Sequence, residues 1–206
     1  AESGTNHSSV LLALPAFRLA ELKILCNGKC TDLDLLGNIE HPPVTSVVLG
    51  FRREDVAHPL DGFGVLIPEI EKFNSLGTIF SSSLFPSRAP RGHVTLTSYI
   101  GGTRAPDLAR LDPDEIIELI MQDLRILVGL NGKPTHSYTC FYPRAIPQYN
   151  VGYGAFKERM DDAEKEAPGL FLGGHFRDGI SLGDSILAGY NAADRIGKHL
   201  DTSSLK

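Results

Sequence analysis

The stretch GLFLGGHFRDGISLGDSILAGYNAAD (169–194) decides the fold, because it joins an apolar strand, a glycine-bearing turn and a helix of small residues. The first N–H groups of a helix have no acceptor within the helix and carry partial positive charge. Gly179 and Gly183 remove side chains beside this end, so a flat or anionic ligand can approach the backbone. Glycines that merely allow close packing of the helix on the strand fit the same pattern. By itself the stretch predicts strand, turn and helix, and leaves ligand binding open.

The composition is that of an ordinary globular chain. Its 206 residues are 42% hydrophobic and 22% charged, with a net charge of −5. Lys and Arg are scattered rather than clustered, so we expect no nucleic-acid partner. The three cysteines form no C-x-x-C pair and the seven histidines no H-x-x-x-H pair, so we expect no metal site and no catalytic histidine.

No apolar run approaches the roughly 20 residues that cross a bilayer, and the first ten residues lack the basic and apolar regions of a signal peptide. We therefore expect a protein that is not secreted, and that is cytoplasmic or internal to an organelle. Because a polar start leads directly into a strand-like run, the chain looks cut from something larger.

The remaining elements follow from hydrophobic periodicity and from Gly and Pro punctuation. Strands are predicted at 8–15, 44–55, 62–68, 77–86, 92–102 and within 134–153. Helices are predicted at 16–25, 31–39, 111–132, 155–168 and 179–200. The helix at 111–132 carries the clearest start signal, with Asp112 as N-cap, Pro113 at the first position and Glu115 closing a capping box.

The order of these elements predicts an α/β (α+β) fold. The run 8–15 is apolar throughout, as in a strand buried on both faces of a parallel sheet. The strands between 44 and 102 follow one another closely, which indicates an antiparallel or mixed sheet. The two ends of the chain therefore form one α/β sheet, into which a separate lobe is inserted.

Three further stretches carry a resemblance: GFGVLIPEIE (62–71), VTLTSYIGG (94–102) and RAIPQYNVGY (144–153). Together with 169–194, in this order and spacing, they resemble oxygen-dependent, FAD-containing protoporphyrinogen oxidases of the amine-oxidase-like flavoprotein superfamily. The resemblance runs from about Ser8 to Leu200 and corresponds to the C-terminal part of that family, a little under half of a full enzyme. The dinucleotide motif G-x-G-x-x-G is missing, since GFGVLI and GYGAFK lack the third glycine.

The resemblance implies three segments: a strand and helix of the FAD domain at 1–24, a substrate-binding lobe at 25–142, and the C-terminal part of the FAD domain at 143–206. It implies FAD as cofactor, a porphyrinogen substrate, and a phosphate-cradling N-terminal half that lies outside this chain. It also implies conversion of protoporphyrinogen IX to protoporphyrin IX with oxygen. Without the missing half, the chain itself is expected to bind FAD weakly and to show little activity.

The resemblance also implies roles for single residues, none of them catalytic. The backbone N–H groups of Ile180, Ser181 and Leu182 would face the flavin, and Tyr142 holds a position near it that is often Trp in the family. The lining of the substrate pocket would include Phe63, Gly64, Leu66 and Tyr99. Each of these also fits an ordinary structural role in a core or turn. We expect Arg177 and Asp178 to form a local ion pair, and the turn histidines, including His41, His58 and His175, to be solvated or locally hydrogen-bonded.

Other functions stay open. Another superfamily member, an amine oxidase or a carotenoid desaturase, would carry a similar turn and helix, although the stretch IPQYNVGY favours the porphyrinogen oxidases. A non-catalytic module that holds a tetrapyrrole or a partner protein is also compatible, because the dinucleotide unit is missing. Peripheral membrane contact and a homodimer are open as well.

Overall fold

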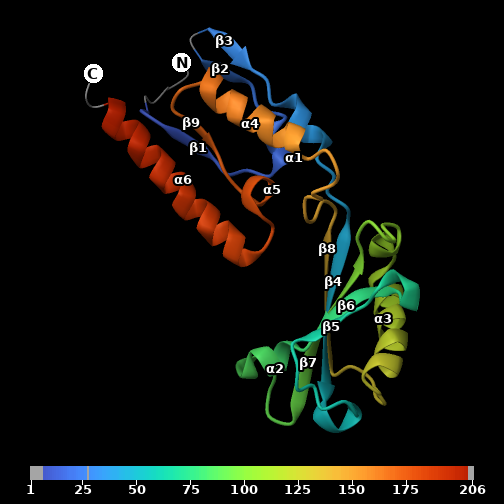
Figure 1. Ribbon diagram of the computed structural model, residues 1–206. Helices are drawn as coiled ribbons and strands as arrows, with labels where there is room; N and C mark the ends of the chain where they lie inside the picture. The colour runs from blue at the N-terminus through green and yellow to red at the C-terminus, as the bar shows by residue number, and fades with distance from the viewer. Residues whose placement is uncertain (1–6, 27, 204–206) are drawn as a thin grey trace, which may run out of the picture. The chain divides into compact units, whose positions relative to one another are not determined.

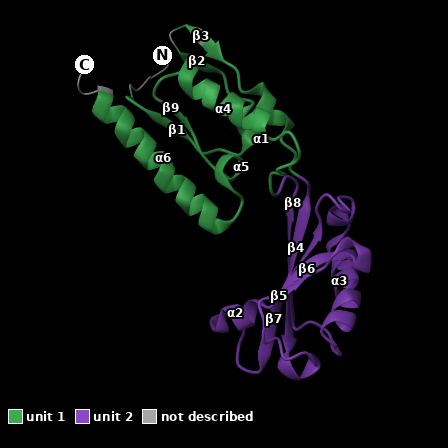
Figure 2. Ribbon diagram, in the orientation of Figure 1, with its two compact units in different colours: residues 1–41, 146–206 green, residues 42–145 purple. Residues whose placement is uncertain are grey.

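The computed structural model describes residues 7–26 and 28–203, and the chain forms two compact units. Unit 1 comprises Ala1–His41 and Ile146–Lys206, and unit 2 comprises Pro42–Ala145 (Figure 2). Unit 2 is therefore an insertion, whose two connecting segments lie side by side: Ala145 N–H donates to the Pro42 carbonyl and Gln148 N–H to the Glu40 carbonyl, at 3.0 and 2.9 Å. The boundaries between the units fall at 41/42 and 145/146, compared with 24/25 and 142/143 from the sequence.

Unit 1 is built on a parallel pair of strands, as the sequence predicts for its two ends. Strand β1 (Val10–Leu12) pairs with β9 (Leu170–Leu172), although the two lie far apart in the chain (Figure 1). The helices of the unit are α1 (Ala16–Leu19), α4 (Gly154–Glu166), α5 (His175–Asp178) and α6 (Leu182–Ser203), with a 3-10 turn η1 (Asp34–Asn38). A shared core includes Leu19, Leu36, Met160, Leu172 and Phe176.

The parallel sheet of unit 1 is only partly covered. All three residues of β9 are buried, but Val10 and Leu11 of β1 are 45% and 43% exposed. Parallel strands are normally buried on both faces and flanked by further strands. Within the described residues β1 pairs with β9 alone, so this sheet leaves apolar strand surface open to a partner.

Two predicted elements are wrong in part. The helix expected at 16–25 ends at Leu19, because Ile24–Cys26 forms strand β2 and pairs with β3 (Lys29–Thr31) in a hairpin whose turn uses Gly28 at φ +76°. The strand expected at 77–86 stops at Ile79. The next residues turn into α2 (Ser81–Leu84), where Ser81 Oγ hydrogen-bonds Thr97 Oγ1 on the sheet at 2.7 Å.

Unit 2 is a five-stranded antiparallel sheet covered on one face by a helix. Its strands are β4 (Val44–Arg52), β5 (Gly64–Leu66), β6 (Ser75–Ile79), β7 (His93–Gly101) and β8 (His136–Tyr142), in the order β5-β6-β7-β4-β8. Short 3-10 turns connect them: η2 (Arg53–Asp55), η3 (Glu69–Glu71), η4 (Pro86–Arg88) and η5 (Leu108–Arg110). The predicted antiparallel lobe is therefore confirmed.

Helix α3 (Pro113–Leu127) begins with the predicted capping box, in which Asp112 and Glu115 exchange hydrogen bonds with the backbone. The face that α3 turns to the sheet packs on alternate residues of β4 and β7. The core that results includes Val47, Leu49, Phe51, Leu96, Ile100, Ile116, Ile120 and Leu124. The other face of the sheet is therefore formed by the intervening residues of each strand.

One buried carboxylate links α3 to the sheet. Asp123 on α3 is 4% exposed, and its two oxygens accept hydrogen bonds from the Ser75 N–H, the Ser75 hydroxyl and the Asn74 amide at 2.7–3.0 Å. The charge is thus fully hydrogen-bonded, as a buried carboxylate must be to be tolerated. It pins the start of β6 to the helix.

Candidate functional site

The first part of the site is the turn that follows β9 in unit 1. The strand ends in Gly173 and Gly174, and α5 leads through Gly179 to α6. Gly179 has φ +122°, and a Cβ there would lie 2.6 Å from Cγ of Asp184. Only glycine lets the backbone pass the Asp184 carboxylate in this conformation. The turn lies after the carboxyl end of a parallel strand, where ligands of open α/β sheets bind.

The start of α6 is partly capped by the chain itself. Ser181 Oγ accepts from the Asp184 N–H at 3.0 Å, and Asp184 Oδ2 accepts from the Ser181 N–H at 3.2 Å. Within the described part of the chain, no acceptor is present for the N–H groups of Ile180, Leu182 and Gly183. Of the three predicted donors, Ile180 and Leu182 are thus available to a ligand, whereas Ser181 is already engaged with Asp184.

Two tyrosines hold this turn in place. The Tyr149 hydroxyl donates to the His175 carbonyl at 2.6 Å and accepts from the Gly179 N–H at 3.0 Å. The Tyr153 hydroxyl donates to the Phe176 carbonyl. The ring centres of Tyr149 and Tyr153 lie 4.3 Å apart. The stretch IPQYNVGY is thereby joined to the turn of GISLGDSI. Both stretches contribute to the family resemblance. No role could be predicted for Tyr149 and Tyr153 from the sequence, because their hydrogen-bond partners are more than twenty residues away in the chain.

Both phenols keep their protons at neutral pH. Burial raises the pKa of Tyr153. Burial also raises the pKa of Tyr149; the Gly179 N–H opposes this, and the carboxylates of Asp178 and Asp184 add to it. Each hydroxyl therefore remains a hydrogen-bond donor to the backbone of α5, which gives the turn a fixed geometry.

A partly buried ion network fixes the elements on either side of the turn. Glu164 of α4 pairs with Arg177 at 2.7 Å and with Arg195 at 2.6 Å, and it also accepts the Leu172 N–H at 2.7 Å. Arg177 makes a second pair with Asp161 at 2.6 Å. The network ties α4, β9, α5 and α6 together. The local pair expected between Arg177 and Asp178 is wrong, because the Arg177 side chain turns inward to these carboxylates.

The turn histidine His175 lies beside a second histidine. It is half-buried, and its ring lies 6.4 Å from that of His41. Burial lowers the pKa of His175, and the neighbouring His41 lowers it further, so the imidazole is neutral at pH 7. His41 and His58 are locally hydrogen-bonded, as expected: His41 Nδ1 contacts the Ile39 carbonyl at 2.8 Å and His58 Nδ1 accepts from the Leu60 N–H at 2.9 Å.

The second part of the site is the sheet face of unit 2 that α3 does not cover, called here the open face. The strand register places five residues in one row across the whole sheet: Leu66, Gly77, Tyr99, Ser46 and Cys140. Directly paired residues of antiparallel strands point to the same face, so Leu66 and Tyr99 share it. Gly77 between them has no side chain, and Leu66 Cδ2 lies 3.3 Å from the place of its missing Cβ. Leu66 therefore leans toward Tyr99.

The predicted lining residues Phe63, Gly64 and Leu66 differ in their exposure and in how tightly they pack. Phe63 is 69% exposed, and Leu66 is 92% exposed. A large apolar side chain as exposed as Leu66, on the open face, is typical of an interaction surface. Gly64 has φ +150°, and a Cβ there would lie 2.2 Å from the Thr78 carbonyl oxygen. The pairing of β5 with β6 thus already requires this glycine.

Tyr142 lies on the same open face, next to the row of Leu66 and Tyr99. Tyr142 pairs with Val44 and is two residues from Cys140 on the same strand. Tyr99 and Tyr142 both belong to unit 2. The Cys140 thiol raises the pKa of the Tyr142 phenol through a hydrogen bond and through charge repulsion, with smaller contributions from burial and from Tyr138 and Tyr99. The structure thus groups Tyr142 with the predicted substrate residues, whereas Ile180, Ser181 and Leu182 lie in unit 1.

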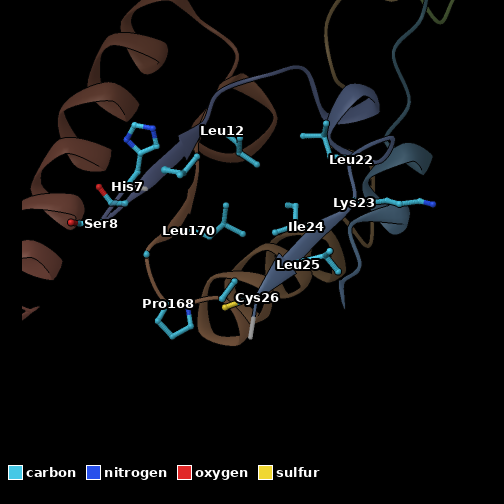
Figure 3. A pocket seen from close by; sticks show the side chains of 14 residues that line it. His7, Ser8, Leu12, Leu22, Lys23, Ile24, Leu25, Cys26, Pro168 and Leu170 are labelled. Carbon is cyan, nitrogen blue, oxygen red and sulfur yellow. The ribbon is translucent and has the colours of Figure 1, made fainter. Parts of the chain in front are cut away.

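A cavity of about 360 Å³ in unit 1 lies elsewhere (Figure 3). Side chains of Leu12, Ile24, Cys26 and Leu170 point into it. It opens beside Ser8 and Pro168, at the amino ends of β1 and β9, opposite to the edge that carries the glycine turn. Because ligands of such sheets bind at the carboxyl ends, we take the turn rather than this cavity as part of the candidate site.

Among residues 7–26 and 28–203 there is no cluster of His, Cys, Asp or Glu that could hold a metal ion. Across the same residues, the helices are too short or too polar to cross a membrane.

The architecture, an α/β unit that ends in a glycine turn and helix and carries an inserted antiparallel lobe, is that of flavin-dependent amine-oxidase-type enzymes. A putative protoporphyrinogen oxidase from Exiguobacterium sp. 255-15 has a similar fold, with a TM-score of 0.74 at 19% identity over 94% of this chain and 41% of that one. The sequence matches the family of flavin-containing amine oxidoreductases over residues 6–197, and the chain belongs to this family.

Two curated relatives are more similar in sequence. Protoporphyrinogen oxidase 2, chloroplastic/mitochondrial, of Arabidopsis thaliana and the mitochondrial protoporphyrinogen oxidase of Nicotiana tabacum are each 35% identical to this chain over 202 residues. These matches cover 97% of this chain and 40% of each relative. The chain thus spans about two fifths of the length of the relatives it matches.

Proposed function

We propose that this chain is the C-terminal part of a flavin-dependent oxidase that converts protoporphyrinogen IX to protoporphyrin IX with oxygen. The single observation that carries the proposal is that its two specific motifs meet: Tyr149 of IPQYNVGY holds the Gly179 turn of GISLGDSI by two hydrogen bonds. The 35% identity to two protoporphyrinogen oxidases supports the same reaction class. The reaction belongs to the formation of haem and chlorophyll.

The residues of the turn fit the pyrimidine end of a flavin. Gly179 and Gly183 leave the backbone bare, and the N–H groups of Ile180 and Leu182 are available for ring acceptors. A helix amino end favours the negative charge of a reduced flavin. FAD supplies the redox chemistry when bound. The chain's own contribution is to orient the ring through Tyr149, which fixes the turn, and through the partial positive charge of α6.

The open face of unit 2 fits the apolar disc of a tetrapyrrole. Leu66 and Tyr99 present aliphatic and aromatic surface there, and Tyr142 extends the same face. A large planar substrate needs walls of this kind. We propose that Leu66 and Tyr99 line the porphyrinogen pocket together with Phe63 and Gly64, and that Tyr142 is a flavin contact.

The dinucleotide-binding part is proposed to come from the complementary N-terminal half of the enzyme. Two surfaces of unit 1 are open to it: strand β1 and one face of α6, which carries Ile186, Leu187 and Tyr190, each more than half exposed. The pyrophosphate of FAD would bind in that half, since no G-x-G-x-x-G is present here. An organelle location and peripheral membrane contact are compatible with an apolar substrate.

The experiment is a chimaera in which this chain replaces the matching segment of the Arabidopsis relative. We expect it to form fluorescent protoporphyrin from protoporphyrinogen. Leu66→Asp should lower kcat/KM at least tenfold, because it places a charge in an apolar pocket. Ile126→Asp is the matched control: Ile126 is an exposed aliphatic residue of α3, which covers the other face of the sheet. Equal loss in both variants, or no oxidation by a folded chimaera, would refute the proposal.

A further inference from the structure

At one end of the unit 2 sheet, β4 stops and β7 and β8 start (Figure 1). The residues at this end include more basic than acidic side chains. Its basic residues are Arg52, Arg53, Arg88, Arg91 and Lys133, opposed by Glu54 and Asp55. Arg52 pairs weakly with Glu54 at 3.8 Å, and Arg53 donates to the Val56 and His58 carbonyls. A chain with a net charge of −5 thus concentrates positive charge at one place.

A slot lies within this basic end. Gly50 of β4 stands between Thr95 of β7 and His136 of β8 in one row of the sheet. Since neighbouring strands are about 4.8 Å apart, Thr95 and His136 stand roughly 10 Å from each other across a bare glycine. A Cβ at Gly50 would lie 3.3 Å from the His136 Cβ. The result is a cavity of about 350 Å³, whose lining includes Arg88, His93 and Thr135.

Arg88 and His93 line the slot, and their positions are set by nearby contacts. The Arg88 carbonyl accepts the Thr95 hydroxyl at 2.8 Å, which ties the Arg88 backbone to β7. The Arg88 guanidinium lies over the Phe85 ring, 5.4 Å from its centre. His93 is two residues from Thr95 on the same strand and faces the same side.

The slot offers charged donors and no carboxylate. The Thr95 and Thr135 hydroxyls already donate to the Arg88 and Gly50 carbonyls, so neither can donate to a ligand. Within the described part of the chain, Arg88 has no carboxylate partner, and no Asp or Glu lines the cavity. His93 Nδ1 contacts the Arg91 carbonyl at 3.4 Å. What remains for a ligand is the Arg88 guanidinium with His93 Nε2 and the His136 imidazole.

We propose that this slot binds an oxyanion, a carboxylate or phosphate group, between Arg88, His93 and His136. A guanidinium recognises such groups through two parallel N–H donors. Imidazolium rings add charge and further donors when they hold a second proton. The inference stands independently of the proposed oxidase function, because Arg88, His93 and His136 are not among the residues assigned to the flavin or to the porphyrinogen.

The test is a titration of the chain with inorganic phosphate, followed through the histidine ring signals in NMR. We expect the signals of His93 and His136 to move together and to saturate, while that of His58 stays fixed. Arg88→Gln should weaken the phosphate affinity at least tenfold, and His136→Gln should weaken it as well. Arg110→Gln should leave it unchanged, since Arg110 lines another cavity of unit 2 and pairs with Asp107.

A competition arm distinguishes the sources of the anion. Coproporphyrin, a tetrapyrrole with several propionates, should displace phosphate if the slot takes carboxylates of a tetrapyrrole. If phosphate binds and coproporphyrin does not displace it, the slot serves a free anion. The proposal fails if the ring signals do not saturate, or if Arg88→Gln and His136→Gln bind phosphate as the unchanged chain does. Failure of the oxidase chimaera would leave this titration unaffected.

Discussion

At the scale of single residues, the site depends on groups whose partners are distant in the chain. Gly179 could be identified from the sequence, because a glycine before a helix is a visible signal. Tyr149 could not be given its role, because its hydroxyl meets the backbone of residues 175 and 179 only after folding. For Arg177 the sequence predicts an ion pair with the adjacent Asp178. Its partners in the structure are Asp161 and Glu164, which lie on another helix.

Tyr149→Phe removes the hydroxyl that both donates to the His175 carbonyl and accepts from the Gly179 N–H. We expect unit 1 to lose about 1–3 kcal/mol in its free energy of unfolding, as measured by urea denaturation. Tyr138→Phe is the control, because that phenol is exposed on the open face of unit 2. An unchanged midpoint for Tyr149→Phe would show that the turn is held by other contacts.

The pH dependence of unit 1 should report His175. Its pKa in the folded chain is lowered from 6.5, so the unfolded state binds the proton more readily. The stability that His175 contributes is therefore complete above about pH 6.5 and is lost as the pH falls through the folded-state pKa. We expect His175→Gln to flatten this part of the stability curve. A curve as steep as that of the unchanged chain would contradict the assignment.

At the scale of elements, local signals predict what local interactions form. The capping box of Asp112 and Glu115 places the start of α3 correctly, because all its partners lie within one turn. The helix predicted at 16–25 fails, since pairing with β3 outweighs the helical spacing at Ile24–Cys26. The row that joins Leu66 to Tyr99 depends on strand order and register, which no local pattern determines.

Asp123→Ala tests how α3 is fastened to the sheet. It leaves the Ser75 N–H and hydroxyl without their acceptor in a buried place. We expect unit 2 to be destabilised by about 1–3 kcal/mol, measured by chemical denaturation. Gln122→Ala, at the exposed neighbouring position, should change stability by less than about 0.5 kcal/mol. Similar values for both variants would show that the Asp123 hydrogen bonds contribute little.

The proposed docking surface on the exposed face of α6 can be tested by substitution. Ile186→Gln combined with Tyr190→Gln replaces two exposed apolar side chains. We expect the isolated chain to keep its thermal unfolding midpoint, and its association with the unmatched part of the Arabidopsis relative to weaken at least tenfold. Circular dichroism and a pull-down between the two pieces measure these effects. Undiminished association would place the docking surface elsewhere.

At the scale of the whole molecule, the two units differ in how fully their sheets are covered. Unit 2 has a continuous core between α3 and five strands, whereas the parallel sheet of unit 1 has two strands in the described chain and leaves Val10 and Leu11 exposed. The sequence correctly predicts an inserted antiparallel lobe. The chain covers about two fifths of the length of the related oxidases. This partial coverage agrees with the exposed surface of strand β1.

The most direct measurement mixes this chain with the unmatched part of the Arabidopsis relative and records bound flavin after gel filtration. We predict that neither piece alone retains FAD, that the mixture does, and that Gly179→Val abolishes retention by forcing a Cβ into the Asp184 carboxylate. Gly154→Ala, at an open position of α4, should retain FAD normally. Flavin retained by this chain alone, or by the mixture with Gly179→Val, would contradict the account.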